Sequence, residues 1–536
     1  MKVLNYKYLF LAALAFSFAA CNDDDSTSSP DDNLPALTAG EADFSKYVAV
    51  GASFSAGFTD GALFIAGQQN SFPNILSQKF ALLGGGDFNQ PLMNDNIGGF
   101  LLGGNLAANP RLFFNGSGPA VLPATPTTEI TTLVSGPFNN YGIPGVKSYH
   151  LGVAGYGMGN PYFGRMASST TASVLGDVAA ENATFFTFSE IGGNDVLAFA
   201  TSGGIGVDQT GNFDPSTYGN NDITDPTVFA ASFSGAVDVL TANGAKGVVA
   251  NVPYITALAH FTTVPYNPLD PSNPSFGPQI PTLNTIFGAL NQVYAFLGTP
   301  ERSIVFSETA ASPVVIHDET LVDLSAQITA TLNANPDFPT FLAQFGLPPQ
   351  AAPAVAYLLG ITYGQARQAT EADLFVLPSS TVIGTVNTNY AAFLTTQGLP
   401  ANLAGQFAVE GVTLPLEDKW ALLPSEQDAI RIATDAYNET ITAVAANKGL
   451  ALVDFKSILQ QASTVGYPDG DFILNTSLVT GGIISLDGVH LTARGYAAMA
   501  NAILKAIDAT YGSNFEASGN LINLGNYPTN YPPTLQ

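Results

Sequence analysis

Two segments at opposite ends of the chain carry side chains that could act together in nucleophilic catalysis. YVAVGASFSAG places Ser53 and Ser55 in a glycine-bounded turn directly after an apolar run. DGVHLTARGY places Asp487 three positions before His490. A carboxylate can hold one ring nitrogen of a histidine while the other takes a proton from a serine hydroxyl. The alternatives are a serine that only caps the following helix and a structural Asp-His pair.

Two further segments could supply hydrogen-bond donors to a developing oxyanion. In FFTFSEIGGND, an apolar run is followed by two glycines and Asn194, whose carboxamide suits that role. In NNYGIPGVKS, Gly145 could present a free backbone N–H after Pro144, although by itself the segment is only a turn. A plain Asn-Asp turn is the alternative at Asn194. The similar string GNND at 219–222 follows a polar stretch, and we expect no catalytic role for it.

Together and in this order, the four segments resemble the blocks of the SGNH/GDSL hydrolase family. GASFSAG resembles the nucleophile block GDSLSxG, NYGIPG the oxyanion-glycine block, GGND the GxND block and DGVH the DxxH block. The resemblance implies a flavodoxin-like three-layer α/β/α sandwich with a parallel sheet of about five strands. It also implies a carboxylic ester hydrolase that needs no cofactor and no metal.

The resemblance assigns a role to each residue. Ser53 would attack the ester carbonyl, His490 would move the proton, and Asp487 would orient the imidazole ring. The N–H groups of Ser53 and Gly145 and the side chain of Asn194 would form the oxyanion hole.

The chain departs from the family pattern at one position of the nucleophile block. Ala52 stands where the family motif has aspartate, so the hydrogen bonding of this turn must differ. Ser55 is the less expected nucleophile because the family uses the first serine. The other three histidines, His150, His260 and His317, have no comparable arrangement, and we expect structural or exposed roles for them.

Apolar runs and helical spacing predict the elements that position these residues. Helices should lie between buried parallel strands, because the runs are continuous rather than alternating. One helix should begin at Ser425 and end at Gly449, and another should begin after Thr492. The expected strands are Tyr47–Val50, Thr184–Phe188, Lys246–Val252 and Leu450–Phe455.

Residues 263–424 are too long to be a structureless loop in a compact domain, and we interpret them as a large insertion over one end of the sheet. Residues 283–297 should be helical, and 303–306 and 313–316 strand-like. We expect this insertion to decide which substrate is taken, although it carries no recognisable motif. The whole of 46–536 would then form one hydrolase domain.

The first residues indicate export and lipid attachment. Lysines precede the apolar stretch Tyr8–Phe18, which has the length of a signal-peptide core, so residues 1–20 should be removed. FAAC resembles a bacterial lipobox, which makes Cys21, the single cysteine, the expected lipid-carrying N-terminus. Residues 21–45 would form a flexible tether whose acidic start resembles that of Bacteroidota surface lipoproteins. The alternative is a secreted protein that loses Cys21 with its signal peptide.

Composition narrows the partners. A formal net charge of −26 with only 16 Lys+Arg argues against nucleic acid. The expected function is hydrolysis of a small-molecule, lipid or glycan ester. The expected location is the cell envelope, as an outer-membrane lipoprotein exposed at the cell surface. Two alternatives stay open: an O-acetyl esterase for surface glycans, and a non-catalytic surface binding protein on the same scaffold. Nothing in the sequence fixes the oligomeric state.

Overall fold

A five-stranded parallel sheet forms the centre of the protein. The computed structural model describes residues 34–536, so the expected signal peptide, Cys21 and the start of the tether lie outside the described residues. The strands follow the spatial order β6 (Asn140–Gly142), β1 (Tyr47–Gly51), β7 (Phe185–Phe188), β8 (Lys246–Ala250) and β13 (Ala451–Val453). Each pair of neighbours is parallel. The predicted parallel sheet of about five strands is therefore confirmed.

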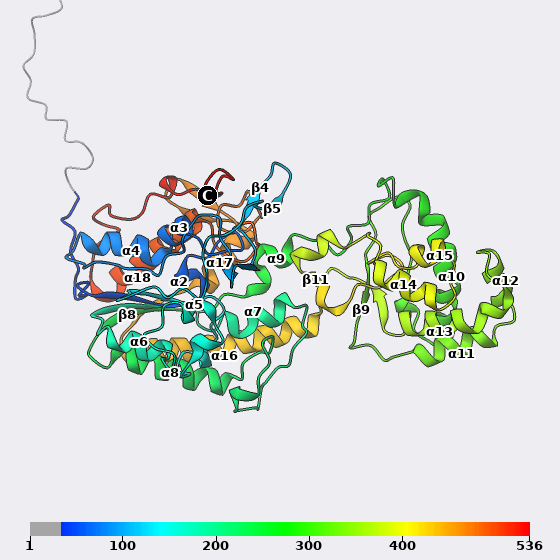
Figure 1. The fold of residues 1–536 in the computed structure, drawn as a ribbon, viewed down its shortest axis with the longest axis horizontal. Coiled ribbons are helices and arrows are strands. Elements are labelled where there is room, and N and C mark those ends of the chain that lie inside the picture. Colours follow the sequence, from blue (N-terminus) through cyan, green and yellow to red (C-terminus); the bar gives the residue numbers. More distant parts are fainter. Residues whose placement is uncertain (1–33) are drawn as a thin grey trace, which may run out of the picture.

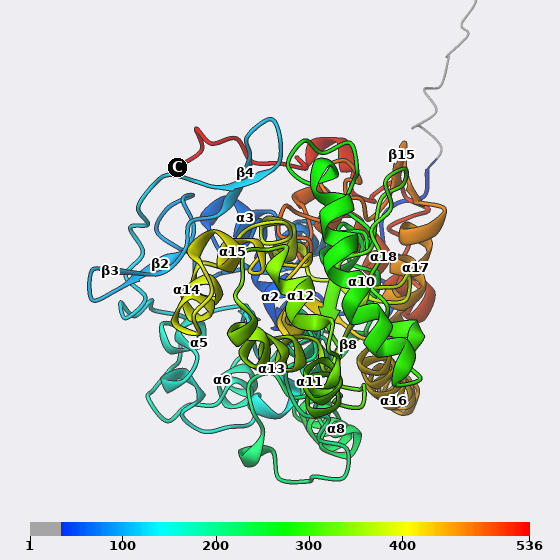
Figure 2. The same cartoon turned by 90° about the vertical axis from the view of Figure 1, so that its right-hand side faces the viewer.

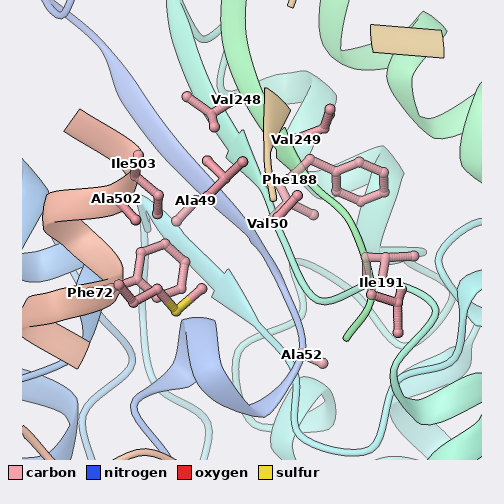
Figure 3. Packing of buried hydrophobic residues seen from close by; sticks show 14 of the residues in the cluster. Ala49, Val50, Ala52, Phe72, Phe188, Ile191, Val248, Val249, Ala502 and Ile503 are labelled. Atoms are coloured by element: carbon pink, nitrogen blue, oxygen red, sulfur yellow. The ribbon is translucent and has the colours of Figure 1, made fainter. Parts of the chain in front are cut away.

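The central strands are buried on both faces, as continuous apolar runs require. Val50 lies opposite Phe188, which in turn lies opposite Val249, so these three side chains share one face. Ala49 and Val248 lie in the alternate positions and share the other face with Ile503 (Figure 3). The core of the protein thus occupies both sides of the sheet.

The sheet differs from the sequence prediction at its two edges. The edge strand β6 was expected to be only a turn, because Asn140–Gly142 contains no apolar run. It pairs with β1 all the same, with Ala49 opposite Asn140. At the other edge, β13 ends before Asp454, whose side chain accepts a hydrogen bond from the N–H of Ser457 at 3.1 Å and begins a helix.

Helices cover both faces of the sheet (Figure 1). On one face lie α4 (Phe72–Ala81) and α18 (Ala493–Tyr511). On the other face lie α6 (Val174–Ala180), α8 (Pro226–Thr241) and α16 (Pro424–Lys448).

The ends of two helices test the predicted capping signals. Thr492 caps α18 as predicted, because its hydroxyl accepts a hydrogen bond from the N–H of Gly495 at 2.9 Å. The predicted start of α16 at Ser425 is wrong. The helix begins at Pro424, and the Glu426 carboxylate caps it by accepting the N–H of Leu423 at 2.6 Å.

Residues 263–423 form a second lobe, here called the insertion lobe, with its own hydrophobic cluster. The remaining described residues, 34–262 and 424–536, form the sheet lobe. Figure 1 shows the two lobes side by side, and Figure 2 shows the insertion-lobe helices in front of the sheet lobe. The helices of the insertion lobe are α10 (Ile280–Phe296), α11 (Ser325–Ala334), α12 (Phe338–Ala343), α13 (Ala352–Tyr363), α14 (Thr388–Thr396) and α15 (Ala401–Gln406).

Inside the insertion lobe, α10 confirms the helix predicted over 283–297, whereas 303–306 is not a strand. The N–H groups of Ile304 and Phe306 donate to side-chain amides of α10 at 2.8 and 2.9 Å, in place of a neighbouring strand. The segment 313–316 contributes to β9 (Val315–His317), which pairs antiparallel with β10 (Ala366–Gln368). Across residues 34–536, no helix combines the length and the apolar character needed to cross a membrane.

The buried face of the sheet predicts a large effect of truncating Phe188. Its side chain is fully buried and packs against Phe233 with ring centroids 5.0 Å apart. We expect Phe188→Ala to lower the free energy of unfolding by about 3–5 kcal/mol, measured by urea unfolding followed by circular dichroism. The matched control is Phe213→Ala, because Phe213 is 67% exposed, and a change within about 0.5 kcal/mol is expected there. Equal effects of the two changes would contradict this account.

Candidate active site

A continuous chain of hydrogen bonds joins Ser53, His490 and Asp487. His490 Nε2 lies 3.0 Å from Ser53 Oγ, and His490 Nδ1 lies 2.9 Å from Asp487 Oδ2. The structure thus brings together residues that are 437 positions apart in the sequence. In this arrangement a hydroxyl, an imidazole and a carboxylate are aligned for proton transfer from the serine.

The Asp487 carboxylate is satisfied by several donors at once. Its Oδ1 accepts the N–H groups of Val489 and His490, both at 2.8 Å, and the hydroxyl of Ser485 at 3.1 Å. Its Oδ2 accepts the N–H of Gly61 at 2.7 Å in addition to the His490 ring. Burial by itself raises the pKa of Asp487, but the neighbouring His490 and these hydrogen bonds outweigh it and hold the pKa well below its usual range. Asp487 therefore stays ionised.

The segment that follows the nucleophile also supports the loop that carries Asp487 and His490, here called the acid-base loop. Gly61 adopts a positive φ of 76° to direct its N–H toward Asp487. The Asp60 carboxyl accepts the N–H of Leu486 at 3.0 Å, and the Asp60 N–H donates to the Ser485 hydroxyl at 3.1 Å. The sequence analysis did not single out Asp60 or Gly61, because their role depends on a contact with a segment more than 400 positions away.

Ser53 is the first residue of α2 (Ser53–Ala56), a short helix that begins where β1 ends. The first N–H groups of a helix have no acceptor within the helix. The N–H of Ser53 is consequently available to a ligand, whereas those of Ala52 and Ser55 donate to Glu190 Oε1 at 2.6 and 2.8 Å. A carboxyl group that follows β7 thus takes up the hydrogen bonding of the turn around Ala52.

Glu190 lies in the segment FFTFSEIGGND, whose sequence predicted no role for this residue. It is held at a positive φ of 52°, which is uncommon for a residue other than glycine. Its Oε2 is buried and has no hydrogen-bond partner within the described residues. Burial raises the pKa of Glu190 to about 7, although the hydrogen bonds from Ser55 and Ala52 act in the opposite direction. The available signal was its place at the end of a buried strand, four positions before Asn194.

The other two expected oxyanion donors, Gly145 and Asn194, lie on adjoining elements. Asn194 is the first residue of α7 (Asn194–Thr201), lines the same cavity as Ser53, and donates from Nδ2 to Val146 O at 2.9 Å. That carbonyl belongs to the turn that carries Gly145, whose φ is +79°. Asn160 Nδ2 donates to Pro144 O at 2.9 Å, so the N–H of Gly145 in the same planar peptide is directed away from Asn160. The turn is thereby fixed from both sides.

Of the remaining histidines, only His260 lies near the triad. Its backbone N–H donates to Gly488 O at 2.9 Å, and its Nδ1 lies 3.4 Å from Asp487 O, so it supports the acid-base loop. Burial lowers the pKa of His150 to about 4, and its ring stacks on Tyr156. His317 belongs to β9 in the insertion lobe.

One group of carboxylates in the described residues has the spacing of a metal site. Oxygens of Glu319, Asp418 and Glu426 lie within 4.8 Å of one another, at the start of α16 and away from the triad. Burial raises the pKa of Asp418 to about 7 and that of Glu426 to about 8. Bound protons can therefore relieve the repulsion within this group.

Comparison with protein-family models, with curated proteins and with solved structures finds no match for this chain. Any assignment of function therefore depends on the residues and geometry described above.

The raised pKa of Glu190 predicts a pH-dependent contribution to stability. The ordinary pKa of a glutamate is 4.5. Between pH 4.5 and about 7 the folded protein therefore keeps a proton on Glu190 that the unfolded chain has released. Stability from this group is therefore complete below pH 4.5 and falls as the pH rises through 7. The free energy of unfolding of the wild type minus that of Glu190→Gln should decrease across this window, measured by urea unfolding at several pH values.

A control for this experiment is Glu129→Gln. Glu129 is only partly buried, and the backbone N–H groups of Gly104 and Gly103 lower its pKa. Its loss should not reproduce the decrease. A difference between wild type and Glu190→Gln that stays constant from pH 4.5 to 8 would contradict the assignment.

Proposed function

We propose that this protein is a serine ester hydrolase in which Ser53 is the nucleophile. The observation that carries the proposal is the hydrogen-bonded series of Ser53 Oγ, the His490 ring and Asp487 Oδ2, with separations of 3.0 and 2.9 Å. Such a series is the arrangement that activates a serine hydroxyl for attack on a carbonyl carbon.

The reaction would proceed in two steps. Ser53 Oγ attacks the ester carbonyl as its proton passes to His490 Nε2, and the ester C–O bond breaks as that proton passes to the leaving alcohol. In the second step, water gives a proton to His490 Nε2 and attacks the acyl carbon. The bond to Ser53 Oγ breaks as His490 returns that proton to Ser53 Oγ, and the carboxylic acid leaves. Asp487 stays ionised throughout and stabilises the imidazolium form of the ring.

The oxyanion formed in each step would be held by Ser53 N–H, Gly145 N–H and Asn194 Nδ2. Asn194 lines the cavity beside Ser53 and is anchored through Val146 O, which fixes its orientation. Fixed donors of this kind stabilise the transition state more than the ground state.

The order of the five strands also supports the SGNH/GDSL resemblance. If the five strands are numbered in chain order, their spatial order across the sheet is 2-1-3-4-5, which is the order of flavodoxin-like sheets. The three functional segments β1 to α2, β6 to Gly145 and β7 to Asn194 follow carboxyl ends of parallel strands, where such sheets carry their sites. Lipid attachment at Cys21 and an outer-membrane, surface-exposed location remain part of the proposal.

The main test compares the two serines of the nucleophile turn. Ser53→Ala should lower kcat on p-nitrophenyl esters by at least about 10⁴-fold and abolish covalent labelling by a fluorophosphonate probe. Ser55→Ala removes a neighbouring hydroxyl and should keep the label, which controls for damage to the turn. Ester hydrolysis that survives unchanged in Ser53→Ala would overturn the proposal. A wild-type protein that takes no label at Ser53 would instead favour a non-catalytic binding protein.

Loss of the side-chain oxyanion donor should affect turnover more than binding. Asn194→Ala should lower kcat by on the order of 10²–10³-fold with little change in KM, because the donor acts on the charge of the transition state. Steady-state kinetics on a soluble ester separates the two constants. A rise in KM with kcat unchanged would assign Asn194 to substrate binding and remove it from the oxyanion hole.

A further inference from the structure

A cavity of about 130 Å³ adjoins Ser53 inside the sheet lobe. One end is lined by Ser53 and Asn194, and the walls come from α17 (Phe455–Thr464) and α18. An apolar cavity of about 150 Å³ accommodates benzene. This one therefore has room for a hydrocarbon group on the order of six carbons.

The chemistry of the lining selects an apolar occupant. The polar side chains Ser53, Glu190 and Asn194 line the cavity near the triad, and most other lining residues are aliphatic or aromatic. Asn251 and Tyr467 also line it, but the Asn251 amide is already engaged: its Nδ2 donates to Asp454 Oδ1 at 2.6 Å and its Oδ1 accepts the N–H of Lys456 at 2.9 Å. Among the wall residues are Leu459 and Met499. A sugar placed here would bury hydroxyl groups without enough hydrogen-bond partners, which is unfavourable, whereas a hydrocarbon chain gains free energy for each methylene it buries.

The position of the His490 ring shows which part of an ester the cavity would take. Val489 and Leu491 line the cavity, but the side chain of His490 does not. Its imidazole ring faces Ser53 Oγ instead. Phe58, which does not line the cavity, packs against that ring with centroids 4.5 Å apart. The leaving alcohol must lie beside His490 Nε2 to receive its proton. The cavity lies on the remaining side of Ser53, where the acyl group stays attached.

The dimensions of the cavity depend on small residues of α18. Ala498 and Ala502 both line it and are four positions apart, so they lie on one face of the helix. A larger side chain at either position would occupy the space that the alanines leave open.

From these observations we infer that the cavity is the acyl-chain site, and that the substrates are esters of apolar acyl chains of about four to eight carbons rather than acetyl esters. This inference rests on the proposed hydrolase function. Because every residue lining the cavity belongs to the sheet lobe, the acyl preference is set there and not by the insertion lobe.

The first experiment measures kcat/KM of the wild type on p-nitrophenyl acetate, butanoate, hexanoate and octanoate. The value should rise by up to about fourfold per added methylene, the effect of about 0.8 kcal/mol of burial, until the cavity is full. A preference for acetate that declines with length would overturn the acyl-chain site while leaving the hydrolase intact. Absence of Ser53-dependent hydrolysis of every ester would instead contradict the hydrolase, and the acyl-chain site with it.

The second experiment fills the cavity. Ala498→Leu should reduce the ratio of hexanoate to acetate kcat/KM by at least about tenfold, because the added carbons occupy the volume of the acyl chain. Ala506→Leu is the matched control: Ala506 lies about two helical turns beyond Ala498 in α18, is only half-buried, and does not line the cavity. The ratio should stay at the wild-type value in this variant. Equal ratios in both variants would overturn the inference.

Fluorophosphonate labelling of Ser53 verifies that each variant keeps an assembled triad. If Ala498→Leu fails to fold, Ala502→Leu tests the same wall from the next helical turn, and the wild-type chain-length series needs no variant at all.

Discussion

A largely buried carboxylate, Asp487, holds together segments from opposite ends of the chain. It accepts hydrogen bonds from the N–H of Gly61, from the backbone and hydroxyl of its own loop, and from the His490 ring. Removing a charge from water without such partners is strongly unfavourable. The conformation of the acid-base loop and its contact with the segment after Ser53 are thus parts of one requirement, the solvation of Asp487. The alignment of His490 with Ser53 follows from it.

A second carboxylate organises the nucleophile turn. Glu190 occupies a strained backbone conformation at the end of β7 and accepts the N–H groups of Ala52 and Ser55. The turn is therefore tied to a neighbouring strand rather than to a side chain of its own. Asp487 is held ionised by its partners, whereas burial shifts Glu190 toward the neutral form. The pKa values of these two carboxyl groups are shifted in opposite directions, because burial dominates at Glu190, whereas at Asp487 the neighbouring His490 and the hydrogen bonds outweigh burial.

The two lobes divide the tasks of the molecule. The sheet lobe contains the triad, Gly61 and Glu190, which support it, and the cavity beside Ser53. The insertion lobe has a hydrophobic cluster of its own. The lobes meet through α9 (Ala259–Thr262), β11 (Leu374–Phe375) and β12 (Ala421–Leu422), with Trp420 packed against both clusters. His260 in α9 contacts the carbonyl of Gly488, so the chain enters the insertion lobe directly beside the acid-base loop.

The sequence by itself determined the elements whose signals are local. Continuous apolar runs fixed β1, β7 and β8, and a threonine followed by helical spacing fixed α18, because burial on both faces and helix capping each depend on a few consecutive residues. Residue type and the flanking glycines made Ser53, Asn194, Asp487 and His490 candidates, and the resemblance to the SGNH/GDSL blocks gave each its expected role.

Only the tertiary structure decided what depends on partners distant in sequence. The edge strand β6 has no apolar run and exists because it pairs with β1. The support of Asp487 by Gly61, the support of the nucleophile turn by Glu190, and the cavity between the sheet and α18 all join segments separated by more than a hundred positions. Their energies come from contacts that no short window of sequence contains.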